Sequence, residues 1–313
     1  MITVLAGGGG APKYMRGLAT VVPATDVVGI VNTGDDLVLH GLRISPDLDS
    51  CTYVLADAVN RETGWGLTGE TWTVMEALER FAPVVPEGSD AATTWFRLGD
   101  RDLATHLYRT ARLREGADLT TVTAEITRAF GLDVRLLPMT TDRVATMVLV
   151  DDVEISFQDY FVGRKHDVAI GGVRFAGIET ARPGPGVLAS INDADRIVIG
   201  PSNPFVSIGP ILAVAGVLDA LLARRADVVA VSPIVAGAAL KGPAARMLAE
   251  LGHEPSVLGI ARLYAELAAT LVIDESDESR RAEIEAEGLR CVVAPTVMHG
   301  VAEAAALAQR TLA

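Results

Sequence analysis

The start of the chain places an apolar segment directly before four consecutive glycines, and this order limits the folds that the chain can adopt. Ile2–Leu5 has the β-branched composition of a buried strand, and a helix is predicted to follow Gly7–Gly10. Glycine loses more conformational freedom on folding than other residues. Four in a row therefore require a reason, such as close approach of the backbone to another group. A strand, a glycine loop and a helix in this order are typical of the first unit of a parallel α/β sheet.

Further apolar segments repeat this arrangement along the chain. Uniformly apolar runs that end in small or polar loops are typical of strands buried on both faces of a parallel sheet. They occur at Asp26–Val31, Arg196–Ile199, Asp227–Val231, Thr270–Ile273 and Arg290–Val293. Long helical patterns cover Ile211–Arg224 and Val301–Leu312. The sequence therefore predicts an α/β fold with a mainly parallel sheet and helices on both faces.

The middle of the chain has a different pattern. From Asp47 to Phe130 the periodicity is mainly helical, which predicts a helical insertion at about residues 50–130 within a single α/β domain of residues 1–313. Arg143–Asp151 and Glu154–Val162 are then predicted to be two strands joined by a short turn. We expect this hairpin to form an antiparallel edge of the main sheet.

The composition excludes several classes of protein. The 313 residues carry a formal charge of -13, and phosphate contacts need clustered Lys and Arg, so a nucleic-acid partner is not expected. No uninterrupted apolar stretch reaches the about 18 residues that suggest a membrane span, and the first residues lack the basic region of a signal peptide. Cys51 and Cys291 have apolar neighbours and are predicted to be free thiols. We therefore expect a cytoplasmic protein without a membrane partner.

The glycine loop has the chemistry of an anion site. Bare backbone N–H groups at a helix N-terminus can surround phosphate oxygens, and the helix dipole favours their charge. The loop is not a P-loop, because the G-x-x-x-x-G-K-[ST] pattern is absent. It also departs from the G-x-G-x-x-G pattern, since Gly7 and Gly9 fit but Pro12 stands at the third required position. A phosphate or nucleotide site is favoured, and a tight turn without a ligand is the alternative.

Two acidic pairs follow the second predicted strand. Asp35 and Asp36 end the run Asn32-Thr33-Gly34-Asp35-Asp36, and Asp47 and Asp49 lie at the start of a predicted helix that Asp47 can cap. Carboxylate oxygens together with phosphate oxygens are the usual ligands of Mg²⁺ in proteins. Like charges held close together repel unless a cation or a proton offsets them. The pairs predict a magnesium site, and a helix cap with a solvated turn is the alternative.

A third polar loop follows the strand at Arg196–Ile199. It offers Ser202, Asn203 and Ser207, and a helix is predicted to begin near Pro210. Hydroxyl and amide groups at a helix N-terminus suit a phosphate, a sugar or a base edge, and ligands bind at the carboxyl ends of strands in such sheets. The alternative is a proline-rich turn with ordinary Ser and Asn caps.

These stretches carry a resemblance to a known family. The motifs cover the chain from Val4 to about Leu212 and read AGGGGAPKYMRGL, VNTGDD, GLRISPDLDSCTY, GWGLTGETW, WFRLGDRDLATHLYRT, RLLPMTTDRVATMV, FQDYFVGR and GPSNPFVSIGPIL. On these motifs the chain resembles the CofD/FbiA family of 2-phospho-L-lactate transferases in coenzyme F-420 biosynthesis. The resemblance implies a Rossmann-like core, a homodimer and Mg²⁺. It also implies transfer of a phospholactyl or phosphoenolpyruvyl group from a guanosine diphosphate ester to 7,8-didemethyl-8-hydroxy-5-deazariboflavin (Fo), with release of GMP.

The resemblance also assigns roles to residues, which we write as expectations. Asp36 and Asp49 are the first choices for Mg²⁺ and for catalysis, followed by Asp35 and Asp47, and an Asp not engaged by metal would accept the proton of the attacking hydroxyl. The substrate-binding residues are expected to be Gly8, Gly9, Gly10, Lys13, Asn32, Asp47, Arg97, Ser202, Asn203 and Ser207. The glycines would approach the phosphates, the late loop would hold guanosine diphosphate, and Arg97 would lie near Fo.

Two other functions compete with this interpretation. One is a nucleotide-sugar-binding regulatory protein of the related GGGTG superfamily, which would bind without turnover, although WFRLGDRDLATHLYRT goes with the transferases. The other is a dinucleotide-dependent oxidoreductase, against which the broken G-x-G-x-x-G pattern argues. Pro12 also departs from the family pattern in the glycine loop, where Lys13 would replace the usual basic residue.

Overall fold

A parallel sheet forms the centre of the protein, whose computed structural model describes residues 1–87, 89, 91–240 and 242–313. Within these ranges, seven parallel strands lie in the order β14, β13, β10, β9, β1, β2, β5. In chain order they are β1 (Ile2–Ala6), β2 (Val27–Val31), β5 (Arg135–Pro138), β9 (Arg196–Ile199), β10 (Val228–Val231), β13 (Thr270–Ile273) and β14 (Arg290–Val293). The six strands predicted for the main sheet are confirmed within one residue at each end. β5 was not predicted from the sequence.

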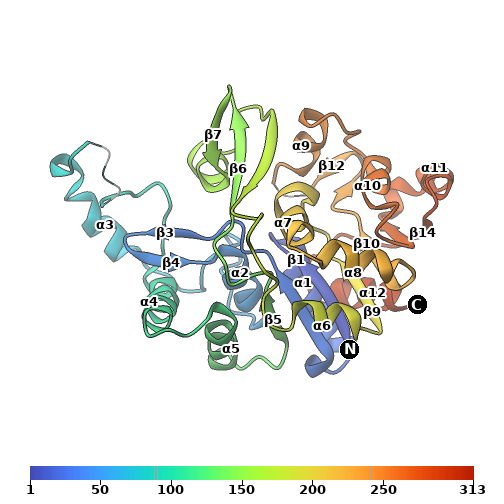
Figure 1. Ribbon diagram of the computed structural model, residues 1–313, viewed down its shortest axis with the longest axis horizontal. Coiled ribbons are helices and arrows are strands. Elements are labelled where there is room, and N and C mark those ends of the chain that lie inside the picture. Colours follow the sequence, from blue (N-terminus) through green and yellow to red (C-terminus); the bar gives the residue numbers. More distant parts are fainter. Residues whose placement is uncertain (88, 90, 241) are drawn as a thin grey trace.

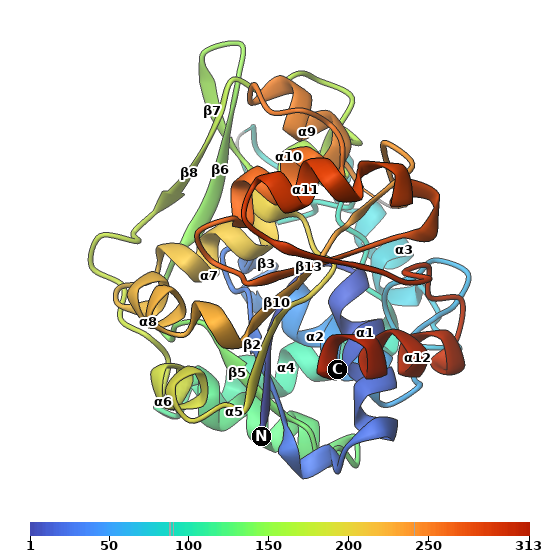
Figure 2. The same cartoon turned by 90° about the vertical axis from the view of Figure 1, so that its right-hand side faces the viewer.

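The strands are apolar on both faces because helices cover both sides of the sheet. In β1, Val4 packs into one core and Leu5 into the other, as the two-residue period of a strand requires. One core involves α1 (Gly10–Val21), α2 (Pro46–Leu55), α5 (Leu119–Ala129) and α12 (Val301–Leu312). The other involves α6 (Val187–Asn192), α7 (Gly209–Ala213), α8 (Val217–Ala223), α9 (Ala244–Glu250), α10 (Val257–Tyr264) and α11 (Arg281–Ala286). Figure 2 shows α1 and α12 on one side of the sheet and α6 and α8 on the other. The predicted Rossmann-like α/β fold is confirmed.

The strand order reverses direction between β1 and β9. From β1 the chain adds β2 and β5 on one side, and from β9 it adds β10, β13 and β14 on the other. In open α/β sheets, ligands bind in the crevice outside the carboxyl ends of the two strands at such a switch point. The glycine loop follows β1 and the loop with Ser202 follows β9, so the topology brings these two segments together.

The helix predicted at Ile211–Arg224 is broken. The segments Pro204–Ala213 and Val217–Ala223 meet at 94°. Val214 has an extended backbone and Gly216 has a φ of 78°, which ends one helix and starts the next. In the part of the chain that the structure describes, no single helix is long and apolar enough to cross a membrane, and only this bent pair meets the length and composition requirements together.

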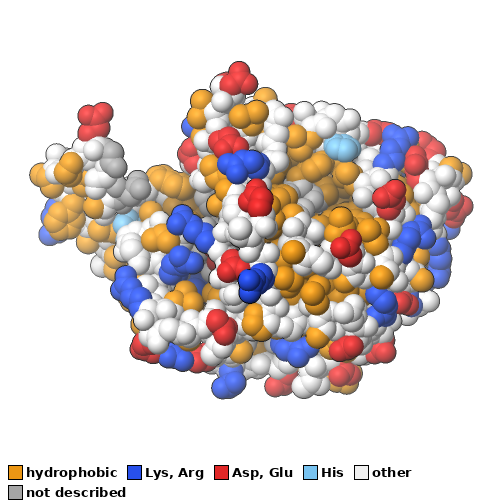
Figure 3. All heavy atoms as spheres, in the orientation of Figure 1, with side chains coloured by type: hydrophobic (Ala, Val, Ile, Leu, Met, Phe, Trp, Pro, Cys, Tyr) orange, Lys and Arg blue, Asp and Glu red, His pale blue; other side chains and the backbone are white. Residues whose placement is uncertain are grey.

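The segment between β2 and β5 holds a small hairpin and several helices. The hairpin consists of β3 (Leu37–Leu39) and β4 (Leu42–Ile44), and the helices are α2, α3 (Thr73–Glu79), α4 (Asp100–Arg114) and α5. In Figure 1, α3 lies at the end of an arm that extends from the rest of the molecule, and Figure 3 shows hydrophobic side chains on the surface of this arm. Glu70 accepts hydrogen bonds from the backbone N–H groups of Arg101 and Asp102, and Asp100 accepts from those of Thr73 and Val74. Each side chain thus caps the other helix.

The predicted antiparallel hairpin is present, but it does not join the main sheet. β6 (Ala145–Val150) pairs with β7 (Val153–Ser156) on one edge and with β8 (Gly172–Ala176) on the other, which leaves neither edge of β6 for β5 or β14. The second strand ends at Ser156 rather than Val162, because the chain then becomes helical over Asp159–Gly163. Phe157 and Tyr160, three residues apart, are buried together by that turn. A further short hairpin joins β11 (Ile234–Val235) and β12 (Ala238–Ala239).

Candidate active site

The loops after β1 and β9 touch each other at the switch point. A Cβ atom added to Gly10 would lie 2.1 Å from the carbonyl oxygen of Pro201, and one added to Gly7 would lie 2.8 Å from the Cβ of Ser207. The Ser202 hydroxyl donates a hydrogen bond of 2.7 Å to the carbonyl oxygen of Gly7. Two of the four glycines are therefore required by the contact between the two loops, because side chains there would collide with backbone or with a neighbouring Cβ.

The other two glycines have different roles. Gly8 allows the backbone conformation of the loop, and Gly9 leaves the start of α1 open to solvent. Gly8 has a φ of 62°, in the left-handed region that favours glycine. Gly9 is exposed, and a Cβ atom added to it would have no neighbour within 4 Å. It is the N-cap of α1, whose first backbone N–H groups have no partners inside the helix. This end of α1 can bind an anion.

Asp47 faces the glycine loop from the start of α2. One carboxylate oxygen accepts a hydrogen bond of 2.8 Å from the Gly8 N–H, and the other accepts one of 2.9 Å from the Asn32 side-chain amide. The Asn32 side-chain oxygen in turn accepts from the N–H of Gly34 at 2.8 Å. The expectation that Asp47 caps α2 is wrong, because Ser45 occupies the N-cap position and Asp47 turns outward to the loop. Asp47 and Asn32 therefore join the ends of β1 and β2.

The turn after β2 contains buried oxygen atoms without partners. Among the described residues, no hydrogen bond reaches Thr33 Oγ1, Asp35 Oδ1, Asp36 Oδ1 or Thr146 Oγ1, and all four atoms are buried. Burial, reinforced by the charge of Asp47, raises the pKa of Asp35 well above its usual value. Burial also raises the pKa of Asp47, although Asn32 and Gly8 oppose the rise. Buried polar atoms normally have a partner, so this cluster offers polar atoms that a ligand, an ion or ordered water can bind.

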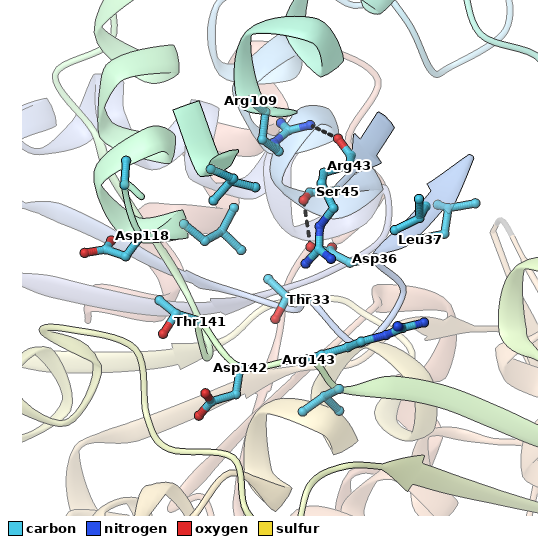
Figure 4. A pocket seen from close by; sticks show the side chains of 15 residues that line it. Thr33, Asp36, Leu37, Arg43, Ser45, Arg109, Asp118, Thr141, Asp142 and Arg143 are labelled. Carbon is cyan, nitrogen blue, oxygen red and sulfur yellow. Dashed lines mark hydrogen bonds between the residues drawn. The ribbon is translucent and has the colours of Figure 1, made fainter. Parts of the chain in front are cut away.

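Asp36 lines two cavities. Burial raises its pKa to about 8, and a hydrogen bond of 2.7 Å from the Ser45 hydroxyl opposes that rise. The first cavity, of 210 Å³, has Arg43, Arg109 and Arg143 among its walls (Figure 4). The second, of 200 Å³, is lined by Asp35, Asp36, Leu39, Trp95, Ala145, Thr146, Phe157 and Gln158, among others. Asp36 therefore belongs to the walls of both cavities.

Asp49 lies in a different environment from the other three acids. Arg109 of α4 donates hydrogen bonds to both carboxylate oxygens of Asp49, and this ion pair is buried. His106 and Asp102 complete a cluster that offers metal-ligand atoms within 4.8 Å of one another. The His106 Nδ1 is 3.2 Å from the Arg109 guanidinium, and its Nε2 is 3.3 Å from Asp102. Because the guanidinium already supplies a positive charge to Asp49, that carboxylate is paired without a metal ion.

The remaining predicted residues have varied surroundings. The Asn203 side-chain oxygen accepts hydrogen bonds from the N–H groups of Phe205 and Val206, which is a helix cap. Ser207 lies against the glycine loop, with its hydroxyl oxygen 3.5 Å from a Cβ built on Gly8. Arg97 is exposed and stacks on Trp72 at 4.6 Å, in the segment that carries α3. Lys13 is an exposed residue of α1.

Three residues of the site were not predicted from the sequence. Arg109 follows Asp102 and His106 at helical spacing, so the three residues share one face of α4, and this spacing could have identified them. Ser45 was considered only as part of a helix start, whereas its hydroxyl binds Asp36. Thr146 belongs to β6, and no signal in the sequence places it beside Asp35.

The fold and the site define a Rossmann-like α/β protein with a glycine loop at an uncapped helix start and clustered acids at its switch point. The model of the family "2-phospho-L-lactate transferase CofD" matches residues 2–301. A phosphoenolpyruvate transferase of Streptomyces griseus is 42% identical over 99% of this chain and 97% of its own length. A 2-phospho-L-lactate transferase of Methanosarcina barkeri is 35% identical over 98% of this chain and 96% of its own length. This chain belongs to the CofD family and is a transferase of that type.

A solved structure supports the fold independently. Protein BH3568 of Bacillus halodurans has a TM-score of 0.63 and 17% sequence identity, and the match covers 100% of this chain and 99% of that one. A second structure of BH3568, which is described as a member of the UPF0052 family, has the same TM-score of 0.63. At this identity the likeness supports the architecture alone.

Proposed function

We propose that the protein transfers a phosphoenolpyruvyl group from enolpyruvyl-2-diphospho-5'-guanosine to the ribityl hydroxyl of Fo, in coenzyme F-420 biosynthesis. The alternative donor is lactyl-2-diphospho-5'-guanosine, which would give a phospholactyl product. The identity of 42% to a relative named phosphoenolpyruvate transferase, against 35% to one named 2-phospho-L-lactate transferase, favours the enolpyruvyl donor. The homodimer and the cytoplasmic location expected from the sequence stay predictions, and light scattering during size-exclusion chromatography tests the first.

One observation carries this proposal. The exposed N-terminus of α1 and the buried carboxyls of Asp35 and Asp47 lie at the switch point. There the Gly8 N–H donates a hydrogen bond to the Asp47 carboxylate. Backbone N–H groups suit the oxygens of a diphosphate, and the carboxylates suit a divalent cation that bridges to it. In this proposal Gly9 and Gly10 approach the phosphates, while Gly8 and Asn32 hold Asp47 in place. Ser202 and Asn203 shape the loop beside them, and Ser207 lies next to the bound diphosphate.

The residues present fit Mg²⁺ at Asp35 and Asp47. The Oδ1 atom of Asp35 is buried without a partner, and the charge of Asp47 helps to raise the pKa of Asp35, as expected for carboxyls that a cation would hold together. When bound, Mg²⁺ would neutralise charge on the diphosphate oxygens. Asp49 is assigned instead to the ion pair with Arg109, which positions α2 against α4. This assignment changes the preference for Asp36 and Asp49 that the sequence suggested.

Asp36 is proposed to accept the proton of the attacking hydroxyl. The hydroxyl oxygen of Fo forms a bond to the outer phosphorus of the donor. The bond from that phosphorus to the bridging oxygen breaks, and GMP leaves with the electron pair. The proton passes to Asp36, whose pKa of about 8 suits a general base near neutral pH. The Ser45 hydroxyl orients the carboxyl by donating to one of its oxygens.

Mass spectrometry of the reaction products tests the proposed function. Purified protein is incubated with Fo, Mg²⁺ and each guanosine diphosphate ester, and we expect Fo to gain the phosphoenolpyruvyl group while GMP appears in equal amount. Asp35→Asn should reduce turnover by on the order of 100-fold and should abolish stabilisation by Mg²⁺ in a thermal-shift assay. Arg128→Gln, on an exposed face of α5, is the control.

Ligand binding separates this function from its alternatives. We expect guanosine diphosphate with Mg²⁺ to raise the melting temperature more than NAD or uridine diphosphate sugars do. Binding of a nucleotide sugar without any turnover of the guanosine esters would favour the regulatory alternative. A preference for NAD would contradict the proposal.

A further inference from the structure

The cavity beside Asp36 contains two arginines whose charges are not paired. Within the described residues, the side chains of Arg43 and Arg143 make no hydrogen bond or ion pair, and both residues are exposed. The third arginine of the cavity, Arg109, is different because Asp49 binds its guanidinium. An arginine that is left unpaired in a protein with 40 acidic residues is available to an anionic ligand.

The acidic residues around the cavity do not supply the missing partners. Asp118 accepts a hydrogen bond of 2.8 Å from the N–H of Thr121 and caps α5. Asp142 accepts one of 2.8 Å from the N–H of Arg182. In Figure 4 both carboxylates point away from Asp36, whereas the Arg43 side chain reaches toward it and Arg143 crosses the opposite wall. Asp36 is therefore the lining acid toward which Arg43 points, and the guanidinium groups of Arg43 and Arg143 are left for an anionic ligand.

The cavity also has the volume and the polar groups of a binding site. Its 210 Å³ holds several groups of the size of a water molecule, each about 30 Å³. Thr33 Oγ1 and Asp36 Oδ1, which belong to lining residues, are buried without hydrogen-bond partners. Arg43 lies close enough to Asp36 for its charge to lower the pKa of that carboxyl against the larger effect of burial. An anion held by Arg43 would thus lie next to the proposed proton acceptor.

We propose that Arg43 and Arg143 form a carboxylate subsite, which holds the three-carbon acid of the donor while its diphosphate lies at the glycine loop. This inference rests on the proposed function, because the acid is the part of that donor which guanosine diphosphate lacks. The backbone N–H groups of the glycine loop suit the phosphates, and the planar guanidinium fork suits a carboxylate. The reacting phosphorus carries the acid directly, so binding both groups places that phosphorus beside Asp36.

The subsite predicts selectivity for acidic donors. A site built to bind a charged group rejects an analogue that lacks it, because the binding groups are then left without partners. Arg43→Gln and Arg143→Gln should each weaken binding of enolpyruvyl-2-diphospho-5'-guanosine by about tenfold or more, since charge-assisted hydrogen bonds are lost. Binding of guanosine diphosphate should change less than about threefold, and Arg128→Gln should change neither affinity.

A binding cycle measures how much of the preference for an acidic donor depends on the two arginines. Calorimetric affinities are compared for the wild type and each variant, using the enolpyruvyl ester and the ethyl ester of guanosine diphosphate, which has no carboxylate. We expect the wild type to prefer the acidic ester and the double variant Arg43→Gln/Arg143→Gln to show no preference. Circular dichroism melting of each variant checks that the fold is retained, and Arg→Lys variants at both positions should recover part of the preference.

The other outcomes overturn the subsite. Equal losses for guanosine diphosphate and for the acidic ester would mean that the arginines bind the diphosphate. Unchanged affinities in both variants, together with normal turnover by the wild type, would remove the arginines from the site and leave the proposed function intact. Failure of the wild type to turn over either guanosine ester would overturn the proposed function and this subsite with it.

Discussion

At the residue scale, two aspartates from one short motif have opposite environments. Asp47 and Asp49 are two positions apart at the start of α2, so they project in different directions around the helix. Asp47 contacts the glycine loop, and Asp49 is bound by Arg109. Removing one partner of a buried ion pair leaves an uncompensated charge, so loss of activity on replacing Asp49 would not show that it binds metal. Asp35 and Asp47 are better positions for testing the proposed metal site.

The raised pKa of Asp36 predicts how stability depends on pH. The folded protein retains the proton up to a pKa of about 8, whereas the unfolded carboxyl releases it from a pKa of about 4. The contribution of Asp36 to the stability of the metal-free wild type should therefore fall as pH rises from 4 to 8. Asp36→Asn cannot ionise, so its melting temperature in EDTA should exceed that of the wild type by several degrees at pH 8.5 and by little at pH 4. A constant difference across this range would contradict the assignment.

At the element scale, the family motifs GWGLTGETW and WFRLGDRDLATHLYRT hold two helices together. Glu70, from the first motif, caps α4, and Asp100, from the second, caps α3. A Cβ atom added to Gly99 would lie 2.1 Å from the carboxyl carbon of Glu70, so glycine is needed for this contact. α4 then presents His106 and Arg109 to α2. The caps therefore act on the site through the position of α4.

Glu70→Ala should destabilise the protein by about 1 kcal/mol, because the first turn of α4 loses the acceptor for two N–H groups. Urea unfolding followed by circular dichroism measures this change. Amide hydrogen exchange should also become faster at Arg101 and Asp102 than at the middle of α4. Glu79→Ala, on an exposed position of α3, is the matched control and should be neutral. Equal effects of the two substitutions would argue against the reciprocal caps.

At the scale of the whole molecule, the site depends on segments that are distant in the sequence. The hydrogen bond from Ser202 to Gly7 joins residues 195 positions apart, and the one from Gly8 to Asp47 joins residues 39 positions apart. The two halves of the sheet meet between β1 and β9, so the loops after these strands can only form together. The switch point is therefore both the proposed ligand crevice and a place where the two halves of the sheet are in contact.

Replacement of single glycines tests this contact. Gly10→Ala should lower the free energy of unfolding by about 1–3 kcal/mol, because the new Cβ would collide with the Pro201 carbonyl and push the two loops apart. Gly9→Ala is the matched control, since its φ of -94° is ordinary and its Cβ would meet nothing within 4 Å. Chemical unfolding should show little change for Gly9→Ala. A fully stable Gly10→Ala protein would contradict the close contact of the loops.

Short-range patterns in the sequence are enough to predict most of the local structure. The six apolar strands and the helix Val301–Leu312 occur where the pattern predicts them, because burial on both faces of a sheet and the helical period are local properties of the chain. The glycine loop between a strand and a helix was equally visible. β5 was not predicted because it is short and lies beside the proline and polar residues of RLLPMTTDR. The hairpin was predicted, but its separation from the main sheet was not, since strand pairing is a long-range choice.

Long-range contacts, by contrast, determine which polar groups share a site. Asp49 and Arg109 are 60 positions apart, and nothing near Asp49 in the sequence indicates that a guanidinium covers it. The unpartnered oxygens around Asp35 and Asp36 likewise become visible only when Thr146 and the glycine loop are in place. Short-range patterns fix where the chain turns, whereas the charge, burial and partners of a side chain depend on residues that folding brings beside it.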